Sequence, residues 1–169
     1  MPGCGKTHFG KLISQTLHLD FIDLDHEIEQ TNQCTISSLF TTIGENAFRT
    51  LESNQLKTIT KSLNKNTIIA CGGGTPCFND NLLLMKESGI VIYIRASITT
   101  LVTNLYSGGS QARPLLHGAE SNKSELASKL EKLLSDRSAF YEQAYRIFDA
   151  DLQDSSIIAD YISICLKEH

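Results

Sequence analysis

The first residues of the chain have the types and spacing of a loop that binds phosphate groups. Residues 3–7 read GCGKT and lead into a helical pattern, and a glycine-rich turn before a helix lets backbone N–H groups converge on an anion. Lys6 supplies a charge for the β- and γ-phosphates of ATP, and the Thr7 hydroxyl is a ligand for Mg²⁺. The N–H donors come from Gly3, Cys4, Gly5, Lys6 and Thr7. The sequence therefore predicts a site for ATP and Mg²⁺.

The first glycine of the full G-x-x-x-x-G-K-[ST] pattern would stand one position before Met1. A buried parallel strand normally precedes such a loop. We expect that strand to be missing, either because the start is placed late or because the chain was cut. Ordering a loop residue without an anchor costs on the order of 1–2 kcal/mol in backbone entropy, so we expect weaker ATP binding and lower stability. The alternative is a chance G-K-T before a helix.

Two carboxylates form the second candidate group. In FIDLDHEIE, Asp23 and Asp25 stand two residues apart at the end of a predicted strand, and residues i and i+2 of an extended chain point to the same side. Parallel strands end at the edge of the sheet where ligands bind. Asp23 is a candidate for holding Mg²⁺ through water, and Asp25 for accepting hydrogen bonds or a proton from a polyol. The alternative is that Asp25 only caps the next helix.

A run of three glycines, Gly72, Gly73 and Gly74, directly follows the predicted strand TIIAC. Such a run removes side chains at a point where another group approaches the backbone closely, and its N–H groups can bind an anion or a hydroxyl. We interpret these glycines as part of the pocket for the phosphate acceptor. A plain turn is the alternative.

Three arginines determine the charge of the acceptor that the site would bind. Arg49 lies on a helix with an apolar stripe, and Arg137 lies one turn before an aromatic pair. Together they could hold a planar carboxylate in fork geometry, whereas the alternative for each is an exposed helix arginine. Arg113 lies in ARPLL, within the stretch 107–122. An arginine brought over the γ-phosphate by closure of a loop would neutralise charge that develops during transfer.

The order of the elements predicts an α/β fold, because short apolar runs alternate with helical patterns along one domain, 1–169. The stretch 107–122 is rich in Gly, Ser and Pro and predicts a mobile lid. The predicted strands are 19–23, 67–71, 89–94 and 146–150, and the predicted helices are 6–17, 44–63, 79–87, 97–106, 123–144 and 155–167.

The composition excludes several classes of partner. The 15 Lys and Arg against 19 Asp and Glu give a net charge of −4, which offers no basic field for nucleic acid or for an anionic membrane. No apolar run is long enough to span a bilayer, and nothing before Pro2 could act as a signal peptide. Five cysteines without a C-x-x-C pair argue against a disulfide framework or a zinc site. We expect a cytoplasmic protein with reduced thiols.

Taken together, these motifs make the sequence similar to the shikimate kinases over nearly its whole length. The motifs that carry the resemblance occur here in the family's order, and they are GCGKT, DLD at 23–25, FR at 48–49, GGGT at 72–75, RPLL at 113–116 and R-x-x-x-Y at 137–141. The resemblance implies transfer of the γ-phosphoryl group of ATP to the 3-hydroxyl of shikimate by a monomer. It also implies a P-loop three-layer sandwich whose parallel strands follow the order 2-3-1-4-5, so that the missing strand would be the central one.

The resemblance also assigns a role to each candidate residue. Lys6 and Arg113 stabilise the transferring phosphate. Asp25 contacts the ring hydroxyls, and Arg49 and Arg137 hold the carboxylate. Gly72, Gly73 and Gly74 line the acceptor pocket. The domain also contains a substrate-binding helical segment, about 25–62, and the lid, about 107–122.

The sequence departs from the family pattern at the adenine contacts. Tyr106 stands where an arginine often stacks on adenine, and 149–156 shows no clear match to the family's adenine loop. Two rival functions stay open at this point. One is a P-loop kinase for gluconate or a nucleoside, and the other is a catalytically impaired nucleotide-binding module.

Overall fold

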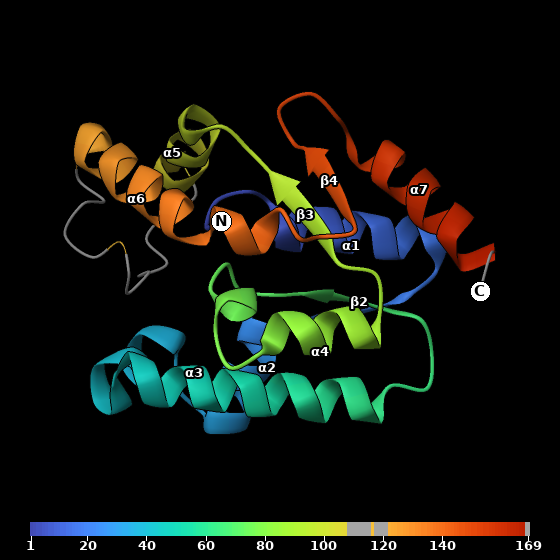
Figure 1. Cartoon of the computed structure of the whole chain (residues 1–169), viewed down its shortest axis with the longest axis horizontal. Coiled ribbons are helices and arrows are strands. Elements are labelled where there is room, and N and C mark those ends of the chain that lie inside the picture. The colour runs from blue at the N-terminus through green and yellow to red at the C-terminus, as the bar shows by residue number, and fades with distance from the viewer. Residues whose placement is uncertain (108–115, 117–121, 168–169) are drawn as a thin grey trace.

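The computed structural model describes residues 1–107, 116 and 122–167, and helices and strands alternate through them (Figure 1). In chain order the elements are α1 (Lys6–Leu17), β1 (Asp20–Asp23), α2 (Leu24–Asn32), α3 (Ile36–Ser62), β2 (Thr67–Ala70), the short 3₁₀ turn η1 (Thr75–Cys77), α4 (Asn81–Ser88), β3 (Ile92–Arg95), α5 (Ile98–Ser107), α6 (Lys123–Tyr141), β4 (Arg146–Asp149) and α7 (Ser155–Lys167).

The four strands form two parallel pairs. β1 pairs with β2, with Asp20 opposite Thr67, and β3 pairs with β4, with Ile92 opposite Arg146. Among the described residues these pairs are two separate two-stranded sheets, whereas the sequence predicted one sheet. The α/β class is confirmed, because parallel strands alternate with covering helices.

Strand and helix boundaries agree with the sequence patterns to within a few residues, except in three places. Helix α2 has no counterpart among the predicted helices. The predicted strand 89–94 begins only at Ile92. The predicted helix 44–63 is the second part of a longer helix, α3, which begins at Ile36. Gly44, with φ of +77°, interrupts α3 with a kink, a backbone conformation that glycine adopts without the strain of a side chain.

Helix α1 lies against both strand pairs. Its Ile13 is buried in a cluster with Phe148 of β4 and Ile158 of α7, and Ile68 of β2 packs at the margin of that cluster. Gly10 of α1 permits the close approach, because a Cβ there would lie 2.6 Å from the ring of Phe21 in β1. This helix therefore connects the two halves of the molecule and carries the phosphate loop at its N-terminal end.

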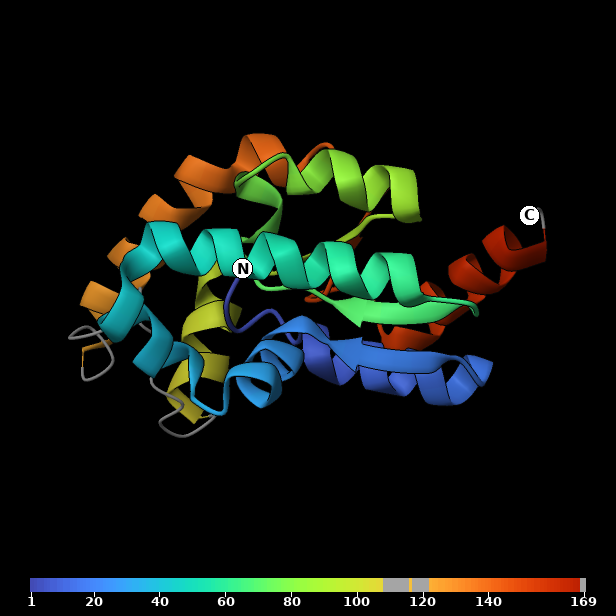
Figure 2. The ribbon, with the colours of Figure 1, turned by 90° about the horizontal axis from the view of Figure 1, so that it is seen from below.

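The opposite face of β1 and β2 is covered by α2 and α3. Ile69 of β2 packs on that side, next to Ile68, because successive residues of a strand point to opposite faces. The core there contains Leu24 and Ile28 of α2 and Phe48 of α3. Figure 2 shows α3 running along this side with α4 beside it. No helix within the described ranges is both long and apolar enough to cross a membrane.

Two neighbouring residues of α1 test the role of this helix. Ile13 is 3% exposed and Leu12 is 36% exposed. We predict that Ile13→Ala lowers the free energy of unfolding by about 2–4 kcal/mol, because it leaves a cavity between the strand pairs. Leu12→Ala, the matched control, should cost less than about 1 kcal/mol. Urea unfolding followed by circular dichroism measures both, and equal losses would contradict the buried position of Ile13.

Candidate active site

The phosphate loop has the backbone of an anion-binding turn. Gly3 and Gly5 have φ of +82° and +84°, in the left-handed region that favours glycine. Gly5 is the N-cap of α1 and makes no side-chain cap, so the first N–H groups of the helix stay available for an anion. The loop is held from α5, because Asn104 Nδ2 donates to the Gly3 carbonyl at 2.8 Å.

Two contacts join this loop to the predicted carboxylates. Lys6 Nζ lies 3.6 Å from Asp25 Oδ2, and the Thr7 hydroxyl donates to Asp23 Oδ2 at 2.7 Å. The two motifs are separated by 16 positions between Thr7 and Asp23, but they meet because β1 runs antiparallel to α1 and ends beside its first turn (Figure 2).

The local geometry of the aspartates differs from the prediction. The sequence placed both on an extended segment, with Asp25 as the alternative cap. Instead Asp23 is the N-cap of α2, accepting hydrogen bonds from the N–H groups of Asp25 and His26. Asp25 belongs to the first helical turn, because the Asp23 carboxylate satisfies the free N–H groups of that turn. Asp25 is directed to Lys6 by the helix and not by strand alternation.

Asp25 is a stronger base than an ordinary carboxylate. Burial raises the pKa of its carboxyl group, and the nearby charge of Lys6 opposes this shift. A carboxylate with a raised pKa, held next to a cation of the phosphate loop, is suited to accept a proton from a hydroxyl group.

Arg49 is a buried cation with ordered partners. It is 5% exposed, Nη1 donates to Glu52 Oε2 at 2.9 Å, and Nη2 donates to Glu45 Oε1 at 3.0 Å. The guanidinium also lies over aromatic rings, with 4.6 Å to the centroid of Phe78. These contacts fix the orientation of the guanidinium group, because the glutamates bind the N–H groups at its edges and the aromatic ring packs against its flat face.

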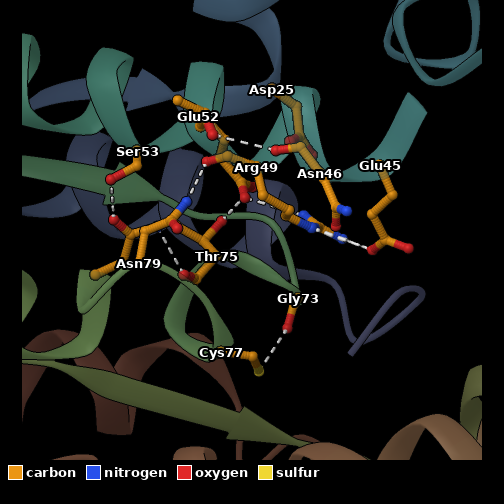
Figure 3. A network of polar contacts seen from close by, with 12 residues as sticks. Asp25, Glu45, Asn46, Arg49, Glu52, Ser53, Gly73, Thr75, Cys77 and Asn79 are labelled. Atoms are coloured by element: carbon orange, nitrogen blue, oxygen red, sulfur yellow. Dashed lines mark hydrogen bonds and ion pairs between the residues drawn. The ribbon is translucent and has the colours of Figure 1, made fainter. Parts of the chain in front are cut away.

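Glu52 connects Arg49 to the glycine run and was not identified from the sequence. It is 1% exposed, and its second oxygen accepts a hydrogen bond from the Thr75 hydroxyl at 2.7 Å (Figure 3). Burial raises the pKa of Glu52, whereas the Arg49 charge opposes it. A signal was present, because an acid three residues after an arginine on the apolar side of a helix can pair with it.

A second set of buried polar groups holds the same turn. Asn81 is fully buried. It accepts from the Ser53 hydroxyl at 2.7 Å and donates to the Thr75 carbonyl at 2.9 Å. Asn79 donates to the Arg49 carbonyl at 2.9 Å, also drawn in Figure 3. Because each buried polar group has a partner, the turn between β2 and α4 is tightly bound to α3.

The three glycines bring the backbone within reach of the charged groups. A Cβ at Gly72 would lie 3.1 Å from Asp25 Oδ1, and one at Gly74 would lie 2.5 Å from Arg49 Nη2. At Gly73 it would lie 3.4 Å from the hydroxyl of Tyr141. None of these glycines has a positive φ. Space requires glycine at Gly74, where a Cβ would overlap the guanidinium group, and is tight at Gly72 and Gly73.

Arg137 lies on the same side of the molecule. It is 7% exposed on α6. Burial raises the pKa of the Cys77 thiol, and the charges of Arg137 and Arg49 both oppose that shift. Arg137 stands four residues before Tyr141 on α6, and the Tyr141 hydroxyl donates to the Gly73 carbonyl at 2.6 Å. Lys6, Asp25, Arg49 and Arg137 therefore gather around one turn. Arg113 and nearly all of the predicted lid lie outside the described residues.

The residues predicted for Mg²⁺ fit a magnesium ion held together with a nucleotide. The Thr7 hydroxyl and the Asp23 carboxylate are adjacent oxygen donors, and Mg²⁺ commonly binds to one or two protein oxygens plus phosphates and water. In the described part of the chain no cluster of three or more His, Cys, Asp or Glu could hold a metal without such help.

The fold and this site define a P-loop kinase for a small acceptor. A family model described as shikimate kinase matches residues 2–167. The shikimate kinase of Bacteroides thetaiotaomicron is 39% identical over 149 residues, covering 88% of this chain and 82% of the relative. That of Flavobacterium johnsoniae is 36% identical over 160 residues, covering 90% and 91%. The chain belongs to the shikimate kinase family.

Solved structures agree with this membership. A crystal structure of the Bacteroides thetaiotaomicron shikimate kinase superposes with a TM-score of 0.86 at 36% identity, covering 98% of this chain and 93% of that one. The shikimate kinase from Acinetobacter baumannii, solved in complex with shikimate, gives a TM-score of 0.84 at 30% identity and covers 99% of this chain and 89% of that one.

The two glutamate partners of Arg49 provide a matched test of the buried ion pair. Their side chains are 1% and 39% exposed for Glu52 and Glu45, respectively. We predict that Glu52→Ala lowers the free energy of unfolding by about 3–5 kcal/mol, because it leaves a buried charge poorly compensated. Glu45→Ala should cost less than about 1 kcal/mol. Chemical denaturation at neutral pH measures both losses. Similar losses for the two variants would show that burial does not determine how much the Arg49–Glu52 pair contributes to stability.

Proposed function

We propose that the residues around the glycine turn carry out the shikimate kinase reaction, in which the γ-phosphoryl group of ATP passes to the 3-hydroxyl of shikimate, giving shikimate 3-phosphate and ADP. The observation that carries this proposal is the contact of 3.6 Å between Lys6 and Asp25. It joins the loop that would bind the phosphates to the carboxylate that would meet the hydroxyl. The related Acinetobacter enzyme is described as a complex with shikimate.

Proton transfer and charge neutralisation are assigned to different groups. Asp25 accepts the proton of the attacking hydroxyl, which its raised pKa favours. Lys6 and the N–H groups of the loop neutralise charge on the transferring phosphoryl group. By resemblance to the family, Arg113 adds a second positive charge from the lid. Mg²⁺, held by Thr7 and through water by Asp23, would neutralise charge on the β- and γ-phosphates.

Acceptor specificity is assigned to the part of the site that would bind the carboxylate of the acceptor. Arg49 and Arg137 are buried cations near the glycine turn, and two guanidinium groups favour a planar carboxylate. The N–H groups of the turn add donors. A nucleoside carries no carboxylate, so this arrangement disfavours a nucleoside kinase. Gluconate also has a carboxylate, and only the assay below separates it from shikimate.

We also infer that the strand pairs are the two halves of one parallel sheet with the family order, in which a further strand lies between β2 and β3. Two observations support this order. β1 pairs with β2 and β3 pairs with β4, both in parallel, and α1 packs against residues of both pairs.

An acceptor-dependent assay tests the function. We predict ADP release that requires shikimate, measured by a coupled enzyme assay with shikimate, gluconate, a nucleoside or no acceptor. Lys6→Ala should reduce turnover at least about 100-fold, because it removes the charge on the transferring phosphoryl group. Lys11→Ala, which removes an exposed lysine of the same helix, should retain activity. Turnover only with gluconate or a nucleoside would refute the shikimate assignment, and ATP binding without any turnover would favour a nucleotide-binding module.

Kinetic constants of arginine variants separate acceptor binding from phosphoryl transfer. Arg49→Ala and Arg137→Ala should raise the KM for shikimate about 10- to 100-fold, because each removes a charged hydrogen bond. Arg113→Ala should chiefly lower kcat, by about 10³-fold, if it neutralises developing charge. Arg146→Ala is the control, since Arg146 lies at the start of β4 over Tyr161. The reverse pattern of KM and kcat would refute these roles.

A further inference from the structure

Tyr141, the last residue of α6, joins that helix to the glycine turn. Its side chain is buried, with 6% exposed. The ring stacks on Tyr93 of β3 at a centroid distance of 4.9 Å. The hydroxyl donates to the Gly73 carbonyl at 2.6 Å and lies 3.6 Å from Met1 Sδ. The tyrosine is thus held at its ring by the sheet and at its hydroxyl by the turn.

The hydroxyl sets the orientation of one peptide plane in the turn. In a planar trans peptide the N–H of Gly74 points away from the carbonyl of Gly73. Tyr141 therefore directs this N–H away from its own hydroxyl. Within the described ranges, the N–H groups of Gly73 and Gly74 donate to no protein acceptor. Both N–H groups thus lack an acceptor in the described part of the chain, and a side chain from α6 fixes the peptide plane that carries the Gly74 N–H.

The same contact sets the position of Arg137. Arg137 lies four residues before Tyr141 on α6, and residues at this spacing share one face of a helix. A hydrogen bond from Tyr141 to the turn therefore holds the face that carries Arg137 at a defined distance from Gly74. The guanidinium group of Arg49 also lies against Gly74.

We propose that Tyr141 is a positioning residue for the acceptor. Its hydroxyl holds the Gly73 carbonyl, so that the Gly74 N–H and the Arg137 guanidinium meet the acceptor carboxylate together. It touches no reacting atom. The inference rests on the proposed function, because it names a residue that acts on the acceptor through the glycine turn. A purely structural tyrosine would contribute to folding without affecting one substrate more than the other.

A pair of conservative variants tests this role. Tyr141→Phe removes the hydroxyl and keeps the ring stacked on Tyr93. Tyr93→Phe is the matched control, because the Tyr93 hydroxyl makes no hydrogen bond to the described residues. We expect Tyr141→Phe to raise the KM for shikimate about tenfold, the effect of one buried hydrogen bond. The KM for ATP and the kcat should change less than about twofold, and Tyr93→Phe should change none of them.

The outcomes separate this inference from the proposed function. If the unaltered protein releases no ADP with shikimate, the proposed function fails. If it does, and Tyr141→Phe lowers only the melting temperature or raises both KM values equally, the positioning role is refuted. In an Arg137→Ala background, Tyr141→Phe should have a clearly smaller effect on the KM for shikimate, because the two residues act together. An undiminished effect would count against the coupling.

A measurement on the unaltered protein covers the case in which Tyr141→Phe fails to fold. In ¹⁵N-labelled protein, shikimate should shift the amide signals of Gly73 and Gly74, whereas ADP alone should not. Unshifted signals at saturating shikimate would show that the turn does not meet the acceptor, and the inference would be wrong.

Discussion

The candidate site depends on the close approach of one backbone turn to side chains from three helices. Gly72 lies against Asp25 of α2, Gly74 against Arg49 of α3, and Gly73 against Tyr141 of α6. Any Cβ at Gly74 would overlap the guanidinium group. Because each glycine faces a different element, the turn sets the distances between groups that would bind the acceptor, and its own position is set in return by their hydrogen bonds.

Buried charges make this arrangement costly unless they are compensated. Arg49 and Glu52 are both nearly inaccessible, and they compensate each other while Glu52 also accepts the Thr75 hydroxyl. Asp25 is compensated less fully, by Lys6 alone among nearby cations with a direct contact in the described residues. Burial therefore raises its pKa. The same desolvation that reduces stability makes Asp25 a better proton acceptor, which is a common arrangement at active sites.

Local patterns predicted much of the fold and several members of the site. The helix 6–17 and all four strands follow from periodicity, and the phosphate loop follows from GCGKT. Asp23 ends β1 as predicted, but the extended geometry predicted for Asp25 was wrong, because α2 begins at Leu24 with Asp23 as its cap. Glu52 was missed although its spacing from Arg49 was a signal, because the sequence does not show that both side chains are buried and that Thr75 joins the pair. The roles given to Arg113 and the lid stay predictions.

The sequence by itself determined which chemical groups are available and which elements carry them, because glycine runs, helix periodicity and strand composition act over a few residues. Only the tertiary structure decided that Lys6 meets Asp25, that Glu52 joins Arg49 to Thr75, and that Tyr141 holds Gly73. The last of these contacts joins residues 68 positions apart. Contacts of this kind arise from the packing of whole helices on strands, and no local pattern encodes their distances.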